Sequence, residues 1–310
     1  MTSFGTVRVA AVQATPVILD AEATVDKAIR LIGAAAADGA ELVVLPETFV
    51  PLYPSNGWAR HAARFGGSDE LWERLWENSV DVPGPLVDRL VEVCSERALY
   101  VAIGVNERES ERPGSLYNTL LLGPEGLELK HRKLVPTQHE RLFHGAGAGD
   151  DLEVAETPLG RVGGLICWEN RMPIARWSVY RKGPQIWVAP TADDSDGWLT
   201  TVRHIAIESG AYVVSVPQYI PKDAFPDDFP LELPDYDVLG RGGAAIIEPT
   251  GGEVIAGPLY DEEGIVTADC DLREGLHAKR WFDAVGHYSG EAALGAAPPP
   301  GGDGAADPQP

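Results

Sequence analysis

Short apolar runs recur along the chain and are separated by segments with a different hydrophobic spacing. The runs cover residues 7–12, 42–45, 100–104, 163–167, 186–189 and 212–216. The run at 7–12 contains Arg8 and is β-favouring, whereas the runs at 42–45 and 100–104 are typical of strands buried on both faces of a sheet. The pattern therefore predicts a strand at each of these positions.

Between the runs, the apolar residues change to helical spacing. In 25–32 they recur at i, i+3, i+4 and i+7, with Asp20 placed to cap the helix and Gly39 placed to end it. A second helical pattern begins near Pro85 and carries Cys94 on its apolar face. Further helices are predicted over 174–180 and 202–209. Strands and helices thus alternate twice along the chain.

Each alternating stretch is followed by a candidate hairpin. Residues 119–130 and 244–256 each contain two β-favouring segments around a turn with Gly and Pro, at 123–126 and 249–252. Strands, helices and hairpins together indicate a mixed α/β sandwich. The segment 221–237 is rich in Pro, Asp and aromatic residues, and we interpret it as a surface loop.

Length alone permits one large domain or two small ones, and the pattern along the chain predicts one domain over residues 1–294. A chain of 310 residues with 44% hydrophobic content is long enough to bury a large core. Residues 295–310 consist mainly of Ala, Pro, Gly and Asp with almost nothing to bury, so a disordered tail is expected there.

The charge balance excludes two classes of partner. With 47 acidic against 25 basic residues, the net charge is −22. Nucleic acids and anionic membrane surfaces both require basic patches, so neither is expected to bind. Neither a transmembrane stretch nor a secretory signal is apparent. A small neutral substrate remains compatible with this composition.

The cysteine and histidine patterns predict neither disulfides nor a metal site. Cys94, Cys167 and Cys270 are odd in number, far apart and without a C-x-x-C pair. The histidines lack a ligand spacing such as H-E-x-x-H, and most are interpreted as surface or packing residues. We therefore expect no metal and no cofactor, and a reducing, cytoplasmic location.

Cys167 is the candidate nucleophile. It ends an apolar run and precedes Trp168-Glu169-Asn170, so its sulfur is expected at a strand-to-helix junction where free backbone N–H groups can hold an anion. From spacing alone, a buried core cysteine is an equally good interpretation. Cys94 and Cys270 are interpreted in that second way.

Glu47 and Lys133 are the other candidate catalytic residues. Glu47 follows the 42–45 run among apolar neighbours, where a carboxylate has a raised pKa suited to general base catalysis. It is also consistent with an acid at a helix N-terminus. Lys133 follows the first hairpin and can place an ammonium beside a thiolate, although a lone lysine is more often a solvated charge. Three such residues at strand ends are more suggestive together than singly.

Three stretches in this order closely resemble the catalytic stretches of the nitrilase superfamily. They are Leu45-Pro46-Glu47, Arg132-Lys133-Leu134 and Gly164-Leu165-Ile166-Cys167-Trp168-Glu169-Asn170. The similarity extends from residue 7 to about residue 289. It implies a four-layer α-β-β-α sandwich that associates through helices into an extended sandwich.

The resemblance also implies a role for each catalytic residue. Glu47 falls on the general base, Lys133 on the group that stabilises the tetrahedral intermediate, and Cys167 on the nucleophile. Glu140 falls on an additional glutamate that positions the substrate and the lysine. No metal or other cofactor takes part in this chemistry.

A narrower resemblance is to the nitrilase branch, carried by Cys167 to Pro173 and by Ala189 to Asp193. It implies hydrolysis of an organic nitrile to a carboxylic acid and ammonia through a Cys167 thioimidate and thioester, with some amide as by-product. The implied substrate pocket is lined by Tyr53, Trp168, Pro190 and Thr191. Aromatic walls favour aryl or arylalkyl nitriles, but Tyr53 and Trp168 are equally consistent with closing the core over the catalytic residues.

Other functions stay open at this point. An aliphatic amidase or N-carbamoyl hydrolase of the same superfamily uses the same catalytic residues. A catalytically inactive scaffold is less favoured because the set of catalytic residues is complete, and a redox sensor lacks a nearby resolving cysteine. The resemblance implies a homodimer or larger homo-oligomer. Spiral growth is the weaker expectation, because Gly290-Glu291-Ala292 stands where that branch commonly has Arg-Pro-Asp.

Overall fold

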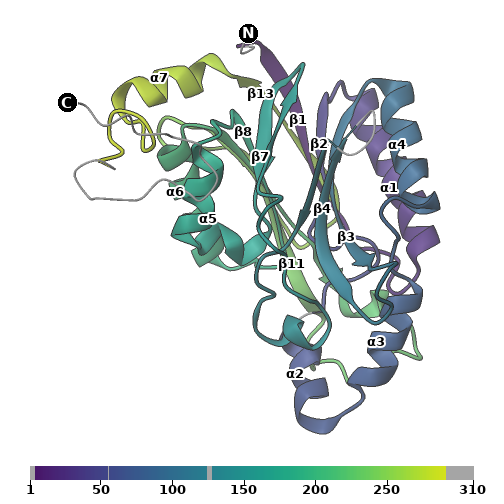
Figure 1. Cartoon of the computed structure of the whole chain (residues 1–310). Coiled ribbons are helices and arrows are strands. Elements are labelled where there is room, and N and C mark those ends of the chain that lie inside the picture. Colours follow the sequence, from purple (N-terminus) through teal and green to yellow (C-terminus); the bar gives the residue numbers. More distant parts are fainter. Residues whose placement is uncertain (1–3, 55, 124–127, 291–310) are drawn as a thin grey trace.

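The computed structural model describes residues 4–54, 56–123 and 128–290. Within these ranges the strands form two sheets that pack face to face, with helices on both outer sides (Figure 1). The predicted mixed α/β sandwich is therefore confirmed, in the four-layer α-β-β-α form. The predicted tail at 295–310 lies outside the described residues, and the domain boundary at 294 stays a prediction.

The first sheet contains strands from the N-terminal half and one late strand. Its order is β13 (Gly264–Asp271), β1 (Thr6–Gln13), β2 (Leu42–Val44), β3 (Tyr100–Arg108), β4 (Leu116–Gly123) and β5 (Leu129–Arg132). The second sheet has the order β10 (Tyr219–Pro221), β11 (Val238–Ile247), β9 (Tyr212–Pro217), β8 (Ile186–Thr191), β7 (Gly160–Gly164) and β6 (Val154–Thr157). β12 (Val254–Tyr260) pairs with β11.

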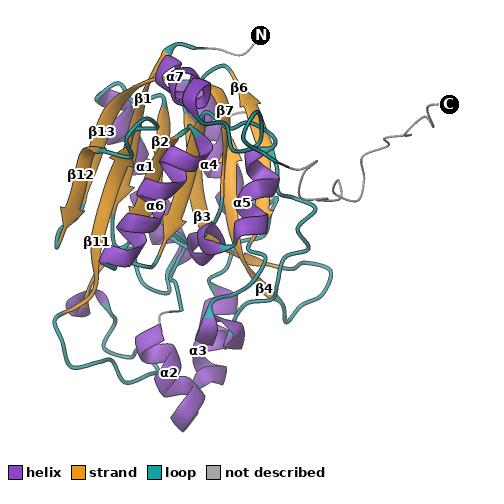
Figure 2. Ribbon diagram, turned by 90° about the vertical axis from the view of Figure 1, so that its left-hand side faces the viewer, coloured by secondary structure: helices purple, strands orange, loops and turns teal. Residues whose placement is uncertain are grey.

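The helices cover the outer faces and one end of the sandwich. α1 (Ala21–Ala37) and α4 (Pro85–Arg97) cover the first sheet, whereas α5 (Pro173–Tyr180) and α6 (Asp196–Ser209) cover the second. α5, α6 and α7 (Arg273–Trp281) face the viewer together in Figure 2. Short 3₁₀ helices lie at η1 (Gln138–Leu142), η2 (Cys167–Arg171) and η3 (Lys222–Ala224).

Alternation along each strand divides the apolar residues between two layers of core. In β1, Val9 and Ala11 pack between the two sheets, whereas Ala10 and Val12 pack against α1. Trp187 of β8 likewise turns outward, toward α5 and α6. Because β2, β8 and β9 are buried over their whole length, their sequences are almost entirely apolar.

The first helix, α1, begins and ends at the residues that the sequence indicated. The Asp20 carboxylate accepts a hydrogen bond from the Ala23 amide at 2.9 Å, and Gly39 takes a φ of 86° just after the helix. Both predicted hairpins form, although β5 begins only at Leu129 and the turn at 124–127 lies outside the described residues. Residue 221 ends β10, and residues 222–237 form a loop that contains η3.

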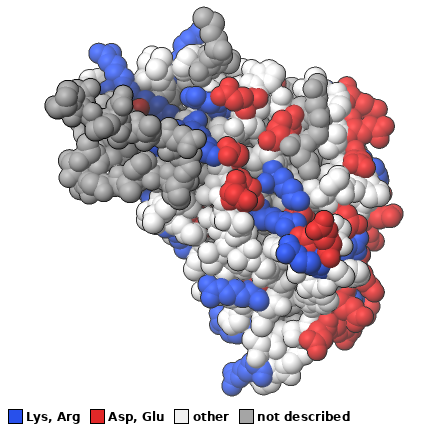
Figure 3. All heavy atoms as spheres, viewed as in Figure 1, with Lys and Arg blue, Asp and Glu red and all other residues white. Residues whose placement is uncertain are grey.

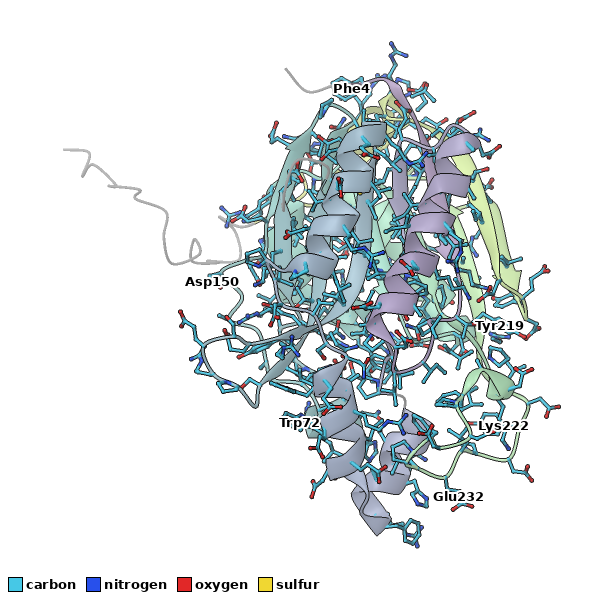
Figure 4. The ribbon with its side chains drawn as sticks, turned by 90° about the vertical axis from the view of Figure 1, so that its right-hand side faces the viewer. Phe4, Trp72, Asp150, Tyr219, Lys222 and Glu232 are labelled. Atoms are coloured by element: carbon cyan, nitrogen blue, oxygen red, sulfur yellow. The ribbon has the colours of Figure 1, made fainter. Side chains whose placement is uncertain are left out.

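One end of the molecule departs from the sequence expectations. Helices α2 (Asn56–Phe65) and α3 (Ser68–Glu77) were not predicted; together with the 221–237 segment they lie beyond the strand ends. In Figure 4 Trp72 of α3 and the loop residues Lys222 and Glu232 mark this region. A separate apolar cluster holds it together and includes Leu71 and Leu75 of α3. This end of the sandwich carries the candidate site.

The surface agrees with the acidic composition. On the face drawn in Figure 3, Asp and Glu side chains gather on the side where Figure 1 places α1 and α4. None of the helices in the described ranges is long and apolar enough to cross a membrane.

Candidate active site

Glu47, Lys133 and Cys167 each lie just beyond a strand, and the fold brings these strand ends together. β2 runs parallel to β1 and β3, and β7 runs parallel to β8, so the segments that leave these strands emerge at one edge of each sheet. Glu47 follows β2, Cys167 opens η2 after β7, and Lys133 directly follows β5. Both Glu47 and Lys133 are close enough to act electrostatically on the Cys167 thiol.

At two glycines, backbone segments next to the catalytic residues pass very close to each other. A Cβ on Gly104 of β3 would lie 2.3 Å from the Thr48 amide nitrogen, beside Glu47. A Cβ on Gly164, at the end of β7, would lie 1.9 Å from the Val188 carbonyl oxygen. Neither position has room for a larger residue, so both loops depend on glycine for their course.

The Lys133 ammonium lies between two buried carboxylates. Its Nζ is 2.7 Å from Glu47 Oε1 and 2.7 Å from Glu140 Oε2. All three side chains have no solvent exposure. The amide of Asn118 bridges the same carboxylates, donating to Glu47 Oε1 at 2.7 Å and to Glu140 Oε1 at 2.9 Å. The Tyr53 hydroxyl donates to Glu140 Oε2 at 3.2 Å.

The two carboxylates differ in their protonation behaviour. Burial raises the pKa of Glu47, and the positive charge of Lys133 only partly offsets this. Burial alone would also raise the pKa of Glu140, but Lys133 and His144 outweigh it and hold that pKa below its ordinary value. Environments that push two pKa values apart are typical of acid-base sites. Glu47 is thus suited to exchange protons while Glu140 remains ionised.

Lys133 remains an ammonium despite its burial. Burial lowers its pKa, but Glu47 and Glu140 more than compensate and place the pKa of Lys133 well above its ordinary value. A fixed positive charge in a buried site can stabilise negative charge that develops on a substrate. The second oxygen of Glu47, Oε2, has no hydrogen-bond partner within the described residues. That oxygen is free to accept a proton from a thiol or from water.

Cys167 has the backbone and surroundings of a constrained residue. Its φ is 50°, a left-handed conformation that is costly for a residue other than glycine. The Thr191 hydroxyl donates to its Sγ at 3.2 Å, and the Asn170 amide donates to its carbonyl oxygen at 2.9 Å. Burial, and next the charge of Glu47, raise the pKa of Cys167 to about 12. The free thiol is therefore protonated and requires a base to become a nucleophile.

A cavity of about 380 Å³ opens onto the sulfur. Tyr53, Trp168, Phe225 and Tyr236 contribute aromatic side chains to its lining. The remaining lining residues are Leu52, Arg60, Thr137, Cys167, Ala192, Asp193, Asp194, Gln218, Ile220, Leu239 and Gly240. Its volume falls within the range of small-molecule sites. 

The residues expected to line this pocket occupy different places. Tyr53 and Trp168 lie on the cavity wall. Thr191 lies against the sulfur and Pro190 is buried within β8; neither is among the lining residues. Phe225 and Tyr236 of the 221–237 segment provide the rest of the aromatic wall. From the sequence, this segment was predicted only as a surface loop.

Several residues of the site were missed at the sequence level. Asn118 lies inside β4, and its neighbours give no sign that its amide bridges two carboxylates. His144 lies four residues after Glu140 and contacts it at 3.1 Å, so an i, i+4 search for a partner of Glu140 would have found it. His131, interpreted as one of the ordinary histidines, forms a buried ion pair with Glu169.

No group of three or more His, Cys, Asp or Glu side chains in the described part of the chain is arranged to hold a metal ion. Cys94 and Cys270 are buried and unpaired with other cysteines, in agreement with their assignment to the core. 

Comparison with known proteins identifies the family of the chain. Residues 8–279 match the carbon-nitrogen hydrolase family. The aliphatic nitrilase of Sinorhizobium fredii is 44% identical over 93% of this chain and 93% of its own length. Nitrilase 1 of Arabidopsis thaliana is 42% identical over 92% of this chain and 84% of its own. The bifunctional nitrilase/nitrile hydratase NIT4A of Lupinus angustifolius is 42% identical, with coverages of 92% and 83%.

Solved structures support the fold. Nit3 of Saccharomyces cerevisiae, a member of branch 10 of the nitrilase superfamily, superposes with a TM-score of 0.71 at 21% identity, covering 92% of this chain and 97% of Nit3. XC1258 of Xanthomonas campestris, a CN-hydrolase superfamily protein, gives 0.69 at 20% identity, with coverages of 90% and 96%. Fold and site thus define a carbon-nitrogen hydrolase. The chain belongs to the carbon-nitrogen hydrolase family and, with 42–44% identity to these nitrilases, to its nitrilase branch.

Proposed function

We propose that this protein is a nitrilase that converts an organic nitrile to the carboxylic acid and ammonia, with Cys167 as nucleophile. One observation carries the proposal: Lys133 lies between Glu47 and Glu140 at 2.7 Å from each, beside a buried thiol that opens onto a cavity. The similarity of this protein to nitrilases over most of its chain supports a nitrile as the substrate.

The first half of the reaction forms a covalent thioimidate. Glu47 takes the proton of the Cys167 thiol, and the thiolate attacks the electrophilic nitrile carbon. The π electrons of the C≡N bond move onto nitrogen, which receives the proton that Glu47 took from the thiol. The Lys133 ammonium stabilises the negative charge while it develops. Glu47 is suited to the proton transfers because burial raises its pKa and leaves Oε2 without a partner among the described residues.

The second half releases ammonia and then the acid. Water activated by Glu47 adds to the thioimidate carbon and forms a tetrahedral adduct. Glu47 passes the hydroxyl proton of the adduct to nitrogen, the C–N bond breaks, and ammonia leaves while the thioester carbonyl forms. A second water then hydrolyses the thioester to the carboxylic acid and free Cys167. Glu140 stays ionised throughout and keeps Lys133 in place, consistent with its lowered pKa.

The cavity supports a substrate with an aryl or arylalkyl group. Tyr53, Trp168, Phe225 and Tyr236 offer aromatic surface for stacking on such a group. The Trp168 ring is held in place because its Nε1 donates to Asp193 Oδ2 at 2.7 Å. Small aliphatic nitriles would leave part of this surface uncovered, so we expect them to have a higher KM.

The test is ammonia release from matched nitriles and amides. A panel of aliphatic, aryl and arylalkyl nitriles with their corresponding amides would be incubated with the protein and with its Cys167→Ala variant. Release from nitriles that is lost in the variant would support a nitrilase. Release from amides alone would assign the protein to the amidases or N-carbamoyl hydrolases, and no release from either would favour an inactive scaffold.

We also propose a homodimer or larger homo-oligomer, located in the cytoplasm. Ile174 on α5 is 81% exposed and Trp281 on α7 is 77% exposed. Figure 2 shows these two helices on the same side of the molecule. Large exposed apolar residues on one face are typical of subunit contacts. Three cysteines without disulfides agree with a reducing compartment.

A further inference from the structure

A second buried ion-pair network, formed by Glu169, His131 and Asp151, lies next to the catalytic groups. His131 Nε2 is 3.1 and 3.0 Å from the two carboxylate oxygens of Glu169, and its Nδ1 is 2.8 Å from Asp151 Oδ1. Glu169 and His131 are each 1% exposed. The reaction proposed above uses none of these side chains, yet burying such charges is costly unless they are well paired.

The carboxylate of Glu169 connects the two catalytic segments. Its Oε2 accepts a hydrogen bond from the Ile166 amide at 2.8 Å, directly before Cys167. Its Oε1 accepts one from the Leu134 amide at 2.6 Å, directly after Lys133. The first of these segments leaves the second sheet and the other leaves β5 of the first sheet. Within the described residues no ladder of backbone hydrogen bonds joins the two sheets, so this side chain bridges them.

Asp151 holds the same segment from its other side. Its Oδ2 accepts a hydrogen bond from the Arg132 amide at 2.7 Å, directly before Lys133. The amides on both sides of Lys133 are therefore bound by carboxylates of one network, and His131 pairs with both carboxylates. We refer to Glu169, His131 and Asp151 as the carboxylate bridge.

We propose that Glu169 is a positioning residue: through the carboxylate bridge it holds Lys133 and Cys167 at a set separation, and this separation directs the reaction to acid instead of amide. The proposal rests on the nitrilase function proposed above. It concerns the tetrahedral adduct, whose carbon carries the Cys167 sulfur, a hydroxyl and an amino group.

The adduct can break down in two ways. A proton transferred to nitrogen lets the C–N electron pair leave with ammonia, and the thioester remains. If the C–S electron pair leaves with sulfur instead, the thiolate of Cys167 is regenerated and the amide is released. The first route needs a proton donor of the Glu47-Lys133 pair close to the nitrogen, so a shift of Lys133 relative to Cys167 slows it and favours amide.

The critical variant is Glu169→Gln, with Glu248→Gln as its matched control. Glutamine has nearly the same volume as glutamate. Its NH₂ group would face the N–H of either Ile166 or Leu134, so one of these two hydrogen bonds would be lost. Glu248 is also a largely buried carboxylate that accepts backbone N–H bonds, from Thr250, Gly251 and Glu253. It follows β11 where that strand pairs with the beginning of β9, at the other end of the sandwich from the active site.

The amide fraction of the product is the main readout, because it does not depend on how much enzyme is folded. We expect Glu169→Gln to raise the amide-to-acid ratio at least about threefold and to lower kcat about 10²-fold, as a misplacement of about 1 Å does, with a smaller change in KM. Glu248→Gln should leave the ratio and kcat unchanged. A folded Glu169→Gln enzyme with the wild-type ratio would overturn the proposal.

Two further measurements test the positioning role if Glu169→Gln does not fold or if no nitrile is a substrate. Asp151→Asn weakens the carboxylate bridge at its more exposed end, where the Asp151 side chain is 24% exposed, and should shift the ratio in the same direction if Glu169→Gln does not fold. The rate at which iodoacetamide alkylates Cys167 needs no nitrile turnover. It should fall about tenfold in Glu169→Gln; an unchanged rate would contradict the positioning role even if no nitrile proves to be a substrate.

Discussion

At the residue scale, the site depends on one lysine shared by two carboxylates with different pKa values. Burial raises the pKa of Glu47, whereas Lys133 and His144 hold that of Glu140 low. Cys167 was visible in the sequence as a candidate because it ends an apolar run. Asn118 was not, because a polar residue within a strand has no local pattern that tells where its side chain lies.

Asn118 is expected to matter for catalysis as much as for packing. Replacing it by Leu removes both hydrogen bonds to the Glu47 and Glu140 carboxylates while nearly conserving volume. Each such bond to a charged group contributes about 1.5–3 kcal/mol, so we expect kcat to fall by about 10–100-fold with little change in KM. Steady-state kinetics together with a thermal midpoint would check this. An Asn118→Leu enzyme with normal kcat would show that Lys133 alone aligns the two carboxylates.

We expect the charge of His131 to make the free energy of unfolding depend on pH. Although burial opposes its charge, Asp151 and Glu169 raise the pKa of His131 from 6.5 to about 9. A pKa that is higher in the folded than in the unfolded protein stabilises the fold fully below pH 6.5, and this stabilisation is lost as the pH rises through about 9. The shift corresponds to about 3 kcal/mol.

The measurement is the free energy of unfolding by urea between pH 6 and pH 10, for the wild type and for His131→Gln. The difference between the two proteins should be largest at pH 6 and shrink toward pH 10. A difference that stays constant over this range would mean that folding does not raise the pKa of His131.

At the scale of elements, most central strands and the helices that cover the two sheets follow from local pattern, whereas the wall of the cavity does not. The i, i+4 pair Leu71 and Leu75 is a local helix signal for α3, although no helix was predicted there. β13 was also missed; it pairs with β1 across about 260 positions of sequence, and its residues are mostly half-buried. Long-range pairing of an edge strand leaves little local hydrophobic pattern.

Leu75 tests whether α3 supports the cavity. It packs in the apolar cluster that also contains the cavity residues Leu52, Ile220 and Phe225. Leu75→Ala should destabilise the protein by about 2–5 kcal/mol and should raise KM more than it lowers kcat, because it loosens the wall and not the catalytic residues. Ile32→Ala in α1 is the control, since Ile32 is fully buried between α1 and the first sheet. If both variants raise KM equally, the effect is one of global stability.

At the scale of the whole molecule, two similar sheets each contribute part of the site. β1, β2 and β3 are parallel in the first sheet, and β7, β8 and β9 are parallel in the second. Glu47 and Lys133 come from the first sheet and Cys167 from the second. The site thus forms only when the two sheets pack, which couples catalysis to the central core.

Ile174 tests the proposed assembly. Ile174→Glu places a charge on the exposed face of α5 and should reduce the oligomer to a smaller species without unfolding the subunit, as measured by light scattering. Phe65→Glu on α2, where Phe65 is 68% exposed, is the control and should leave the oligomer intact. A wild-type protein that is already monomeric, or an unchanged oligomer in Ile174→Glu, would contradict an interface at α5.

The sequence by itself determined the class of fold and the three candidate catalytic positions. The periodicity of apolar residues indicates which faces of each element are buried. The stretches around Glu47, Lys133 and Cys167 resemble the catalytic stretches of the nitrilase superfamily. Only the tertiary structure decided which side chains meet. Asn118 bridges two carboxylates, and Glu169 bridges two sheets, because segments far apart in sequence pack together. Such contacts depend on distances between elements, which no local pattern along the chain encodes.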